Sequence, residues 1–549
     1  MRTAFIATLG AALLGLGCPT SSTPIEDPTP APEPDPCGEL GLPTRAFQTE
    51  GEFGSVRWTL AADFTIEEMS DRSEWTLSEN WTGCDSYAFL PDRGTPFLRS
   101  PLDPTSLWED GVLDLLDRSP RNAHYFFYSA ASSNTDADPI LEAMVERIEE
   151  DLDQLDDEDA AWWRPRLHVV RGRIGARDDW VEAVTKTGRP GFTIDRFQRI
   201  REIGSLADVE RFSSALQAAE QWPWENNMAY VANELRYYDY EARRQEYLDA
   251  QDATVVSVEE FSGQLVGGDN VLSTVTFPSA TELQAFDTLE VDLTALCPEV
   301  DEQETGNCGA WDYLSHIWIR KSDEDDWTEL ARFITTYHRA ARYLVDATPL
   351  LAVIAEGGEW QLRYATSPPW NHQQYMTEMD FRFTNQGKGY RPSAATTPLW
   401  GGKNFNSEYN DGREPIDVDI PATAQRVEIW ALITGHGGNN NNCAEFCNHQ
   451  HEWTIGDQTY FHEHDTIGND MACVEAIDNG TVPNQSGTWW FGRGGWCPGQ
   501  QVDPVIFDVT DQVTPGGTAT VSYRGLYNNG AIPDNSGNIV MSSWLVVYE

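Results

Sequence analysis

The chain has 549 residues, with 88 Asp and Glu against 37 Lys and Arg, so its formal net charge is −51 at pH 7. This acidity excludes a general nucleic-acid binder, because phosphates would be repelled, and it disfavours adhesion of the protein surface to anionic lipid. The length is too great for one domain and suits three, once a leader and a linker are set aside.

The N-terminus has the pattern of an export signal. Met1 and Arg2 precede an apolar run from Ala4 to Leu16, which ends at Gly17-Cys18. A basic start, a short apolar core and small residues before a cysteine are typical of a bacterial lipoprotein signal peptide. The run is also too short to span a bilayer as a helix. We expect residues 1–18 to be this signal, with lipidation of Cys18 and anchoring at the outer membrane or cell surface; ordinary secretion is the alternative.

Residues 19–45 are predicted to be a linker. The stretch from Pro19 to Pro36 is rich in Pro, Thr, Ser, Glu and Asp, a composition that cannot bury a core. At about 3 Å per residue it would hold a domain about 50 Å from its anchor. This arrangement suits a tethered surface enzyme and a tethered binding module equally.

Residues 46–250 have the pattern of an α/β domain of unknown function. Expected here are strands over 124–129 and 167–170, a helix opening at Asp138-Pro139, and helices over 207–219 and 227–249. Asp63–Ile66 and Trp81–Ser86 faintly resemble a thioredoxin-like domain. Cys84 lacks the second cysteine of a redox motif, since Tyr87 stands there, so dithiol chemistry is not expected.

From Val255 onward the helical patterns stop and short strands separated by Gly, Pro, Asp and Asn turns take over. Many short strands with turn signals predict sandwiches or barrels. A bridge rich in Gly, Pro and Asn, from Asn385 to Pro415, separates two groups of strands. We expect one β domain over 251–395 and a second over 396–549.

Nine cysteines are present. Without Cys18 eight remain, an even number in an exported chain, so disulfides are expected. The sequence alone allows 105 pairings of eight cysteines. The spacings do not fit a structural zinc site.

Acids and aromatic residues gather beside several of these cysteines. Glu445 lies inside Cys443-Ala-Glu-Phe-Cys447, Asp312 follows Cys308-Gly-Ala-Trp311, and Arg493-Gly-Gly-Trp496-Cys497-Pro-Gly follows later. Carboxylates supply acid–base chemistry or bind hydroxyls, and flat aromatic rings stack on sugars. The pattern predicts a sugar site.

These three motifs, together with the segment Glu329–Thr335, resemble the bacterial peptide-N-glycosidase F family of glycoamidases from about Val255 to Glu549. The resemblance implies two tandem eight-stranded antiparallel jelly rolls with the active site between them. It also implies hydrolysis of the amide between the innermost N-acetylglucosamine and asparagine of N-linked glycoproteins or glycopeptides, without a cofactor.

The resemblance implies roles for individual residues. Asp312 and Glu445 match catalytic acids; without the family, Asp312 would be interpreted as a turn cap and Glu445 as a solvated loop residue. Matched to substrate binding are Trp311, Arg493, Trp496 and Trp370. The disulfides implied are Cys297–Cys308, Cys443–Cys447 and Cys473–Cys497, which leaves Cys37 and Cys84 able to pair with each other.

Two positions depart from the family. Ser367 stands where the family has a further Glu, and Tyr313 follows the catalytic Asp where the well-known enzyme has Arg. The glycan range, and activity itself, depend on these changes. A catalytically silent glycan-binding or adhesion lipoprotein on the same scaffold is therefore the alternative function.

Four histidines offer a rival interpretation. His449, His451, His462 and His464 resemble a metal cluster, and copper monooxygenases of the peptidylglycine-hydroxylating type use paired jelly rolls with His and Met ligands. We prefer the interpretation that these alternating histidines face outward from a hairpin, and no metal is expected.

Overall fold

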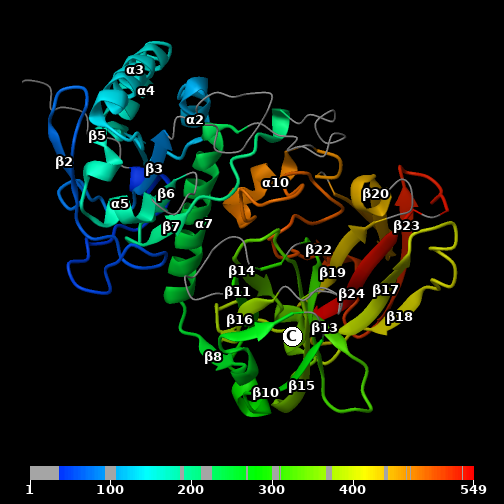
Figure 1. Cartoon of the computed structure of the whole chain (residues 1–549). Helices are drawn as coiled ribbons and strands as arrows, with labels where there is room; N and C mark the ends of the chain where they lie inside the picture. Colours follow the sequence, from blue (N-terminus) through cyan, green and yellow to red (C-terminus); the bar gives the residue numbers. More distant parts are fainter. Residues whose placement is uncertain are drawn as a thin grey trace, which may run out of the picture.

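The computed structural model describes residues 36–92, 107–185, 191–211, 226–267, 270–298, 308–309, 311–366, 374–437, 443–464, 466–469, 471–534 and 536–549. Three bodies of secondary structure lie side by side: an N-terminal α/β part and two groups of β-sheets (Figure 1). Within the described part of the chain, no helix is long and apolar enough to cross a membrane. The predicted signal peptide and Cys18 lie outside the described residues.

The N-terminal part is built around one mixed sheet. Its elements are α1 (Pro36–Glu39), β1 (Thr65–Glu67), β2 (Glu74–Thr76), β3 (Ser86–Asp92), α2 (Leu113–Arg118), β4 (Ala123–Ser129), α3 (Asn134–Leu152), α4 (Asp157–Trp163), β5 (Leu167–Arg173), α5 (Trp180–Thr185), β6 (Phe192–Ile194), β7 (Ile200–Glu202) and α7 (Val231–Asp249). The sheet order is β5-β4-β3-β6-β7. β3, β4 and β5 are parallel, and β6 and β7 form an antiparallel hairpin beside β3.

This sheet has the burial expected of a covered parallel sheet. Every residue of β3 and β4 is buried, because helices in parallel crossovers cover the faces of such a sheet. Cys84, just before β3, forms a disulfide with Cys37, so these two cysteines do pair. The thioredoxin-like assignment stays a prediction.

Helix α3 begins earlier than the sequence suggested, so the expected cap at Asp138 is wrong. The helix starts at Asn134, and the Ser133 side chain accepts a hydrogen bond from the Asp136 amide. A serine hydroxyl is among the best groups for satisfying a free amide at a helix start, so Pro139 falls inside the helix. Most of the helix expected over 207–219 lies outside the described residues.

The rest of the chain is mainly β. The first sandwich contains β8 (Thr254–Ser257), β9 (Gln264–Val266), β10 (Val271–Phe277), α8 (Ala280–Leu283), β11 (Thr288–Leu296), β12 (Leu314–Arg320), β13 (Thr328–Ile334), β14 (Ala341–Asp346), β15 (Gly358–Ala365) and β16 (Tyr375–Thr384). The second contains β17 (Thr397–Asn404), β18 (Ile416–Asp419), β19 (Arg426–His436), α9 (Cys443–Phe446), β20 (His449–Ile455), β21 (Gln458–Glu463), α10 (Ala472–Glu475), β22 (Val505–Asp508), β23 (Thr518–Tyr527) and β24 (Asn538–Tyr548). The domain boundaries at 251 and 396 stay predictions.

The strand order identifies both sandwiches as jelly rolls. The first pairs a sheet β10-β15-β12-β13 with a sheet β14-β11-β16-β8, in which β9 also pairs with β16. The second pairs β17-β24-β19-β22 with β18-β23-β20-β21. Counting β8 and β9 as one interrupted strand, each sandwich has its first, eighth, third and sixth strands in one sheet and its second, seventh, fourth and fifth in the other. This is jelly-roll order, so the predicted fold class, two tandem antiparallel jelly rolls, is confirmed.

Arg332 on β13 joins the two sandwiches. Its fully buried guanidinium pairs with Glu329 at 2.6 Å. It also donates to Thr434 Oγ1 at 3.1 Å and to the Val540 carbonyl at 2.7 Å, both in the second sandwich. The amide of Val502 donates to the carbonyl of Arg332 at 2.9 Å, so a segment of the second sandwich covers the free edge of β13.

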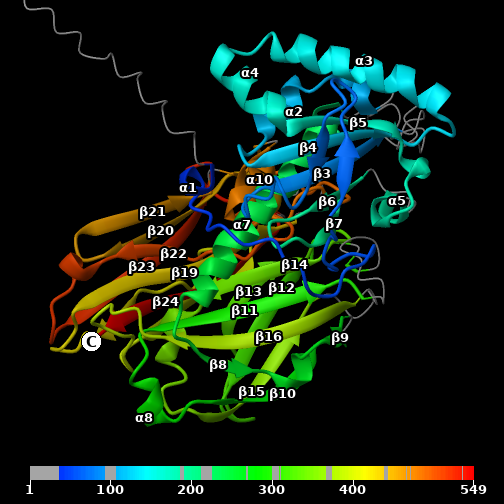
Figure 2. The ribbon, with the colours of Figure 1, turned by 90° about the vertical axis from the view of Figure 1, so that its left-hand side faces the viewer.

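Helix α7 joins the α/β part to the sandwiches (Figure 2). Glu234 on α7 is buried and pairs with Arg339 of the first sandwich at 2.8 Å. It also accepts a hydrogen bond from Asn484, in the connection before β22, at 2.9 Å. Further along the helix, Glu241 pairs with Arg201 of β7 at 2.8 Å. One helix therefore contacts all three bodies: buried ion pairs reach the α/β part and the first sandwich, and a buried hydrogen bond reaches the second.

We expect Arg332→Met to destabilise the protein strongly. It would leave Glu329 buried without its cation, which typically costs about 3–5 kcal/mol, and the urea midpoint followed by circular dichroism should fall clearly. The control is Arg171→Ala, whose ion pair with Glu67 is 38% and 40% exposed and should contribute less than about 1 kcal/mol. Equal small shifts in both variants would contradict this account.

Candidate active site

Three side chains from separate segments meet where the two sandwiches join. Asp312 precedes β12 in the first sandwich, while Glu445 in α9 and Arg493 in the loop before β22 come from the second. Nη2 of Arg493 lies 3.1 Å from Oδ2 of Asp312, and its Nε lies 3.4 Å from Oε1 of Glu445. One guanidinium thus pairs with both carboxylates that the sequence singled out.

The cation is buried and the two acids reach solvent. The Arg493 side chain is 1% exposed, against 16% for Asp312 and 19% for Glu445, so a substrate can touch the acids but not the arginine. Burial raises the pKa of Asp312 above its ordinary value, although Arg493 and the Tyr337 hydroxyl act to lower it. Burial also raises the pKa of Glu445, and the neighbouring charge of Asp312 adds to the effect. One cation between two acids favours a pair that shares a proton.

A helical turn and a glycine amide orient Glu445. The amide of Cys447 donates to the carbonyl of Cys443 at 2.8 Å, which closes the turn α9. The amide of Gly437 donates to Oε2 of Glu445 at 2.9 Å. Gly437 has a φ of +51°, a left-handed conformation that glycine adopts without a steric cost.

The predicted disulfide around Glu445 is wrong for this structure. Cys443 and Cys447 are free thiols, and their Sγ atoms lie 2.7 Å apart, farther than the ~2.05 Å of a disulfide bond. The helical hydrogen bond closes the loop in its place. The predicted bridges Cys297–Cys308 and Cys473–Cys497 are confirmed.

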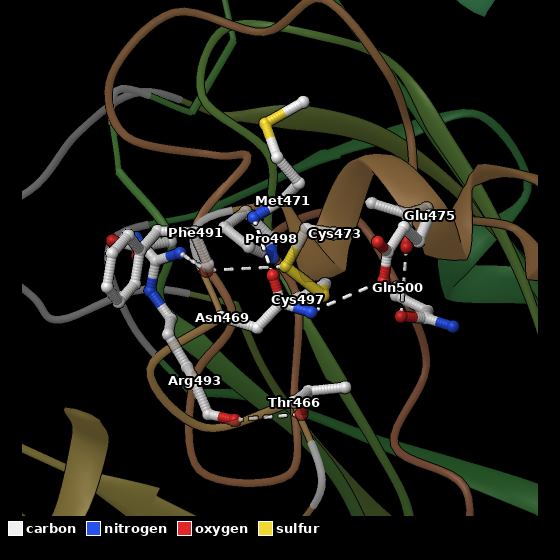
Figure 3. Close-up of a disulfide and its surroundings, with 12 residues drawn as sticks. Thr466, Asn469, Met471, Cys473, Glu475, Phe491, Arg493, Cys497, Pro498 and Gln500 are labelled. Atoms are coloured by element: carbon white, nitrogen blue, oxygen red, sulfur yellow. Dashed lines mark hydrogen bonds and ion pairs between the residues drawn. A yellow bond between two sulfur atoms is a disulfide. The ribbon is translucent and has the colours of Figure 1, made fainter. Parts of the chain in front are cut away.

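The second of these bridges anchors the loop that carries Arg493 (Figure 3). Within the loop, Nη1 of Arg493 donates to the Phe491 carbonyl at 2.7 Å, and the Arg493 carbonyl accepts from Thr466 Oγ1 at 3.3 Å. The Trp496 ring lies 4.9 Å from the Arg493 guanidinium carbon. Trp496 is 5% exposed, so its ring packs against the Arg493 guanidinium and is not open for a sugar ring to stack on.

Trp311 has the opposite environment. Its side chain is 55% exposed beside Asp312, and its ring centroid lies 6.4 Å from that of Tyr337. An exposed indole next to paired carboxylates offers a surface on which a sugar ring can stack. Trp370 and Ser367 lie outside the described residues.

The comparisons with known proteins point to one family. Residues 404–546 match the family model described as peptide-N-glycosidase F, C terminal. Over this part the chain resembles peptide-N-glycosidase F. A curated relative, the peptide-N(4)-(N-acetyl-beta-D-glucosaminyl)asparagine amidase F of Elizabethkingia miricola, is 24% identical over 281 residues, or 48% of this chain and 74% of the relative. The predicted resemblance is therefore confirmed over part of the chain.

Solved structures of similar proteins were also found. The peptide-N-glycosidase F structure from Flavobacterium meningosepticum is 20% identical with a TM-score of 0.42, and the match covers 54% of this chain and 96% of that one. A structure of PNGF-II is 13% identical with a TM-score of 0.38, and covers 65% of this chain and 74% of that one.

Tyr337 and His436 also belong to the site, and neither was predicted from the sequence. The Tyr337 hydroxyl bonds to Asp312 and lies 3.4 Å from Nη2 of Arg493. The His436 ring stacks on Trp496 with centroids 5.2 Å apart, and burial lowers the pKa of His436 to about 3. His436 stands in a Gly-rich stretch that predicts a turn, but it is the last residue of β19. No local sequence pattern indicated Tyr337.

The histidines also differ from expectation. His449 and His451 are fully buried, so the prediction that they face outward is wrong for these two. Alternate residues of β20 share one face, and that face, which continues through Trp453 and Ile455, packs into the core.

Asp312→Asn should leave the protein as stable as the wild type at low pH and make it relatively more stable as the pH rises. The raised pKa means that ionising Asp312 costs more in the folded chain than in the unfolded one, so the wild type loses stability as the pH passes through that pKa. Melting temperatures of both proteins from about pH 3, below the ordinary pKa of Asp, to about pH 9 test this. A variant that is less stable at high pH would show that the Asp312–Arg493 pair is a net stabilising contact.

Proposed function

We propose that this protein is a peptide-N-glycosidase. It would hydrolyse the amide between the innermost N-acetylglucosamine and the asparagine of N-linked glycoproteins or glycopeptides. The observation that carries the proposal is the pairing of one buried arginine with two partly exposed acids, Asp312 and Glu445, beside the exposed Trp311. The match of residues 404–546 to peptide-N-glycosidase F supports the same activity.

The two acids suit the chemistry of amide hydrolysis. Water adds to the amide carbonyl carbon, the C–N bond breaks, and the nitrogen takes a proton and leaves with the sugar, so the asparagine becomes aspartate. An acid with a raised pKa can give a proton to the nitrogen, and its ionised neighbour can take one from the water. Arg493 holds both carboxylates in position, and the innermost sugar stacks on Trp311.

We further propose that the enzyme is exported and anchored to the membrane only through lipid on Cys18, with residues 19–45 as its tether. A tethered surface location would give access to glycoproteins outside the cell. Cys18→Ser should move the protein from the membrane fraction to the soluble fraction, and continued membrane association of that variant would contradict the anchor.

The activity is tested by incubating an N-linked glycopeptide with the protein in water enriched in oxygen-18. Mass spectrometry should show the sugar-free peptide with aspartate in place of asparagine and one heavy oxygen in its new carboxylate. Asp312→Asn and Glu445→Gln should each lower the rate by about 10²–10⁴-fold. Asp323→Asn, which changes an acid 82% exposed in the same sandwich, is the control and should keep the wild-type rate.

The alternative is a silent glycan-binding protein on this scaffold. The exposed Trp311 would serve binding as well as catalysis, and Ser367 replaces an acid of the family. The same glycopeptide distinguishes the two functions, because a silent protein binds it and releases no peptide.

A further inference from the structure

The core of the second sandwich contains three histidines that converge on one point. His449 and His451 lie on β20 and are fully buried, and His464, which follows β21, is partly buried. Each offers one ring nitrogen, and these nitrogens lie within 4.8 Å of one another. Imidazoles this deep in a sandwich need partners, since an unpaired buried nitrogen is unfavourable.

The partners of these rings are incomplete. Nδ1 of His449 lies 2.9 Å from Nε2 of His451, and Nδ1 of His464 lies 3.1 Å from Nε2 of His462. Nε2 of His464 is buried and makes no hydrogen bond. The His449 ring forms a hydrogen bond with the backbone of Ala444, so the incomplete ring is that of His464.

Two tyrosines hold the His451 ring in place. Nδ1 of His451 lies 2.7 Å from the hydroxyl of Tyr523, which lies 2.9 Å from the hydroxyl of Tyr409. A histidine that binds a metal through one nitrogen usually donates its other N–H to an oxygen, which fixes the ring orientation. For His451 this oxygen is the hydroxyl of Tyr523.

The N-terminal part also contains a buried pair of histidines, and carboxylates lie beside it. Nδ1 of His124 lies 3.1 Å from Nε2 of His168. The outer nitrogens of that pair face carboxylates: Glu68 lies 2.6 Å from His168 and Asp85 lies 3.3 Å from His124. Each outer nitrogen of that pair has a carboxylate within ion-pair distance, so a buried histidine pair alone does not imply a ligand.

We propose that His449, His451 and His464 bind one divalent transition-metal ion of the imidazole-preferring class, with Zn²⁺ as its representative. Nitrogens bound tetrahedrally at 2.0–2.1 Å lie about 3.4 Å apart, a spacing between the 2.9 Å of the closest pair and the 4.8 Å limit of the cluster. An all-imidazole set selects Zn, Cu or Ni over Mg or Ca. The proposal does not depend on the glycosidase activity.

The ion would strengthen the loop that carries Arg493. A Cβ added at Gly494 would lie 2.8 Å from Nε2 of His449, and one added at Gly495 would lie 2.8 Å from Nε2 of His464. The loop backbone therefore packs directly on the histidine rings. An ion that fixes these rings fixes the surface on which the neighbouring Arg493 is held, so its role is structural.

The first test uses the full chain with a tag that contains no histidine. Elemental analysis by mass spectrometry should find about one Zn²⁺ or Cu²⁺ per chain, as for a structural site. After chelation and dialysis, added Zn²⁺ should raise the melting temperature by mass action, and Co²⁺ should give the visible absorption of a tetrahedral site. The proposal is overturned if the reconstituted wild type holds less than about a tenth of an equivalent and Zn²⁺ leaves its melting temperature unchanged.

Variants separate this site from adventitious binding. His464→Gln should lower Zn²⁺ affinity by at least about tenfold, while the matched control His168→Gln, in the pair beside two carboxylates, should keep the wild-type stoichiometry. If His464→Gln does not fold, Tyr523→Phe removes only the supporting oxygen and should weaken binding about 10–100-fold. Wild-type affinity in either His464→Gln or Tyr523→Phe would overturn the assignment.

Discussion

A buried arginine shared by two acids is the constraint on which the candidate site depends. Arg493 pairs with Asp312 of one sandwich and with Glu445 of the other. Its charge is out of solvent, so removing either carboxylate would change the balance of a desolvated cluster and not merely a surface contact. With one positive charge for two negative ones, the cluster favours holding a proton. Acid–base chemistry requires such a group.

The surrounding fold holds that arrangement in place. The acids come from different sandwiches, so a small rotation of one jelly roll against the other would separate them. Arg332 resists this rotation by bonding across the joint to Thr434 and Val540. Because a displacement of ~1 Å can cost about a hundredfold in rate, a buried ion pair that touches no substrate can matter as much as a residue that does.

The two buried histidine pairs show how environment decides what a residue can do. His124 and His168 have the carboxylates of Asp85 and Glu68 within ion-pair distance of their outer nitrogens. His449 and His451 instead have a third imidazole nearby, that of His464, whose Nε2 is buried and makes no hydrogen bond. Two histidine pairs with similar separations therefore lie between two carboxylates in one case and beside a third imidazole in the other.

The sequence by itself determined what depends on local pattern. Alternating apolar residues between turn signals marked the sandwiches, and the motifs around Asp312, Glu445 and Arg493 identified the residues that the fold brings together. Only the tertiary structure decided what depends on distant partners: that one arginine pairs with both acids, and that a helical turn orients Glu445 without a disulfide. The prediction that His449 faces outward was wrong, because alternation says which strand residues share a face but not which face meets the core. That choice is made by the packing of the opposing sheet.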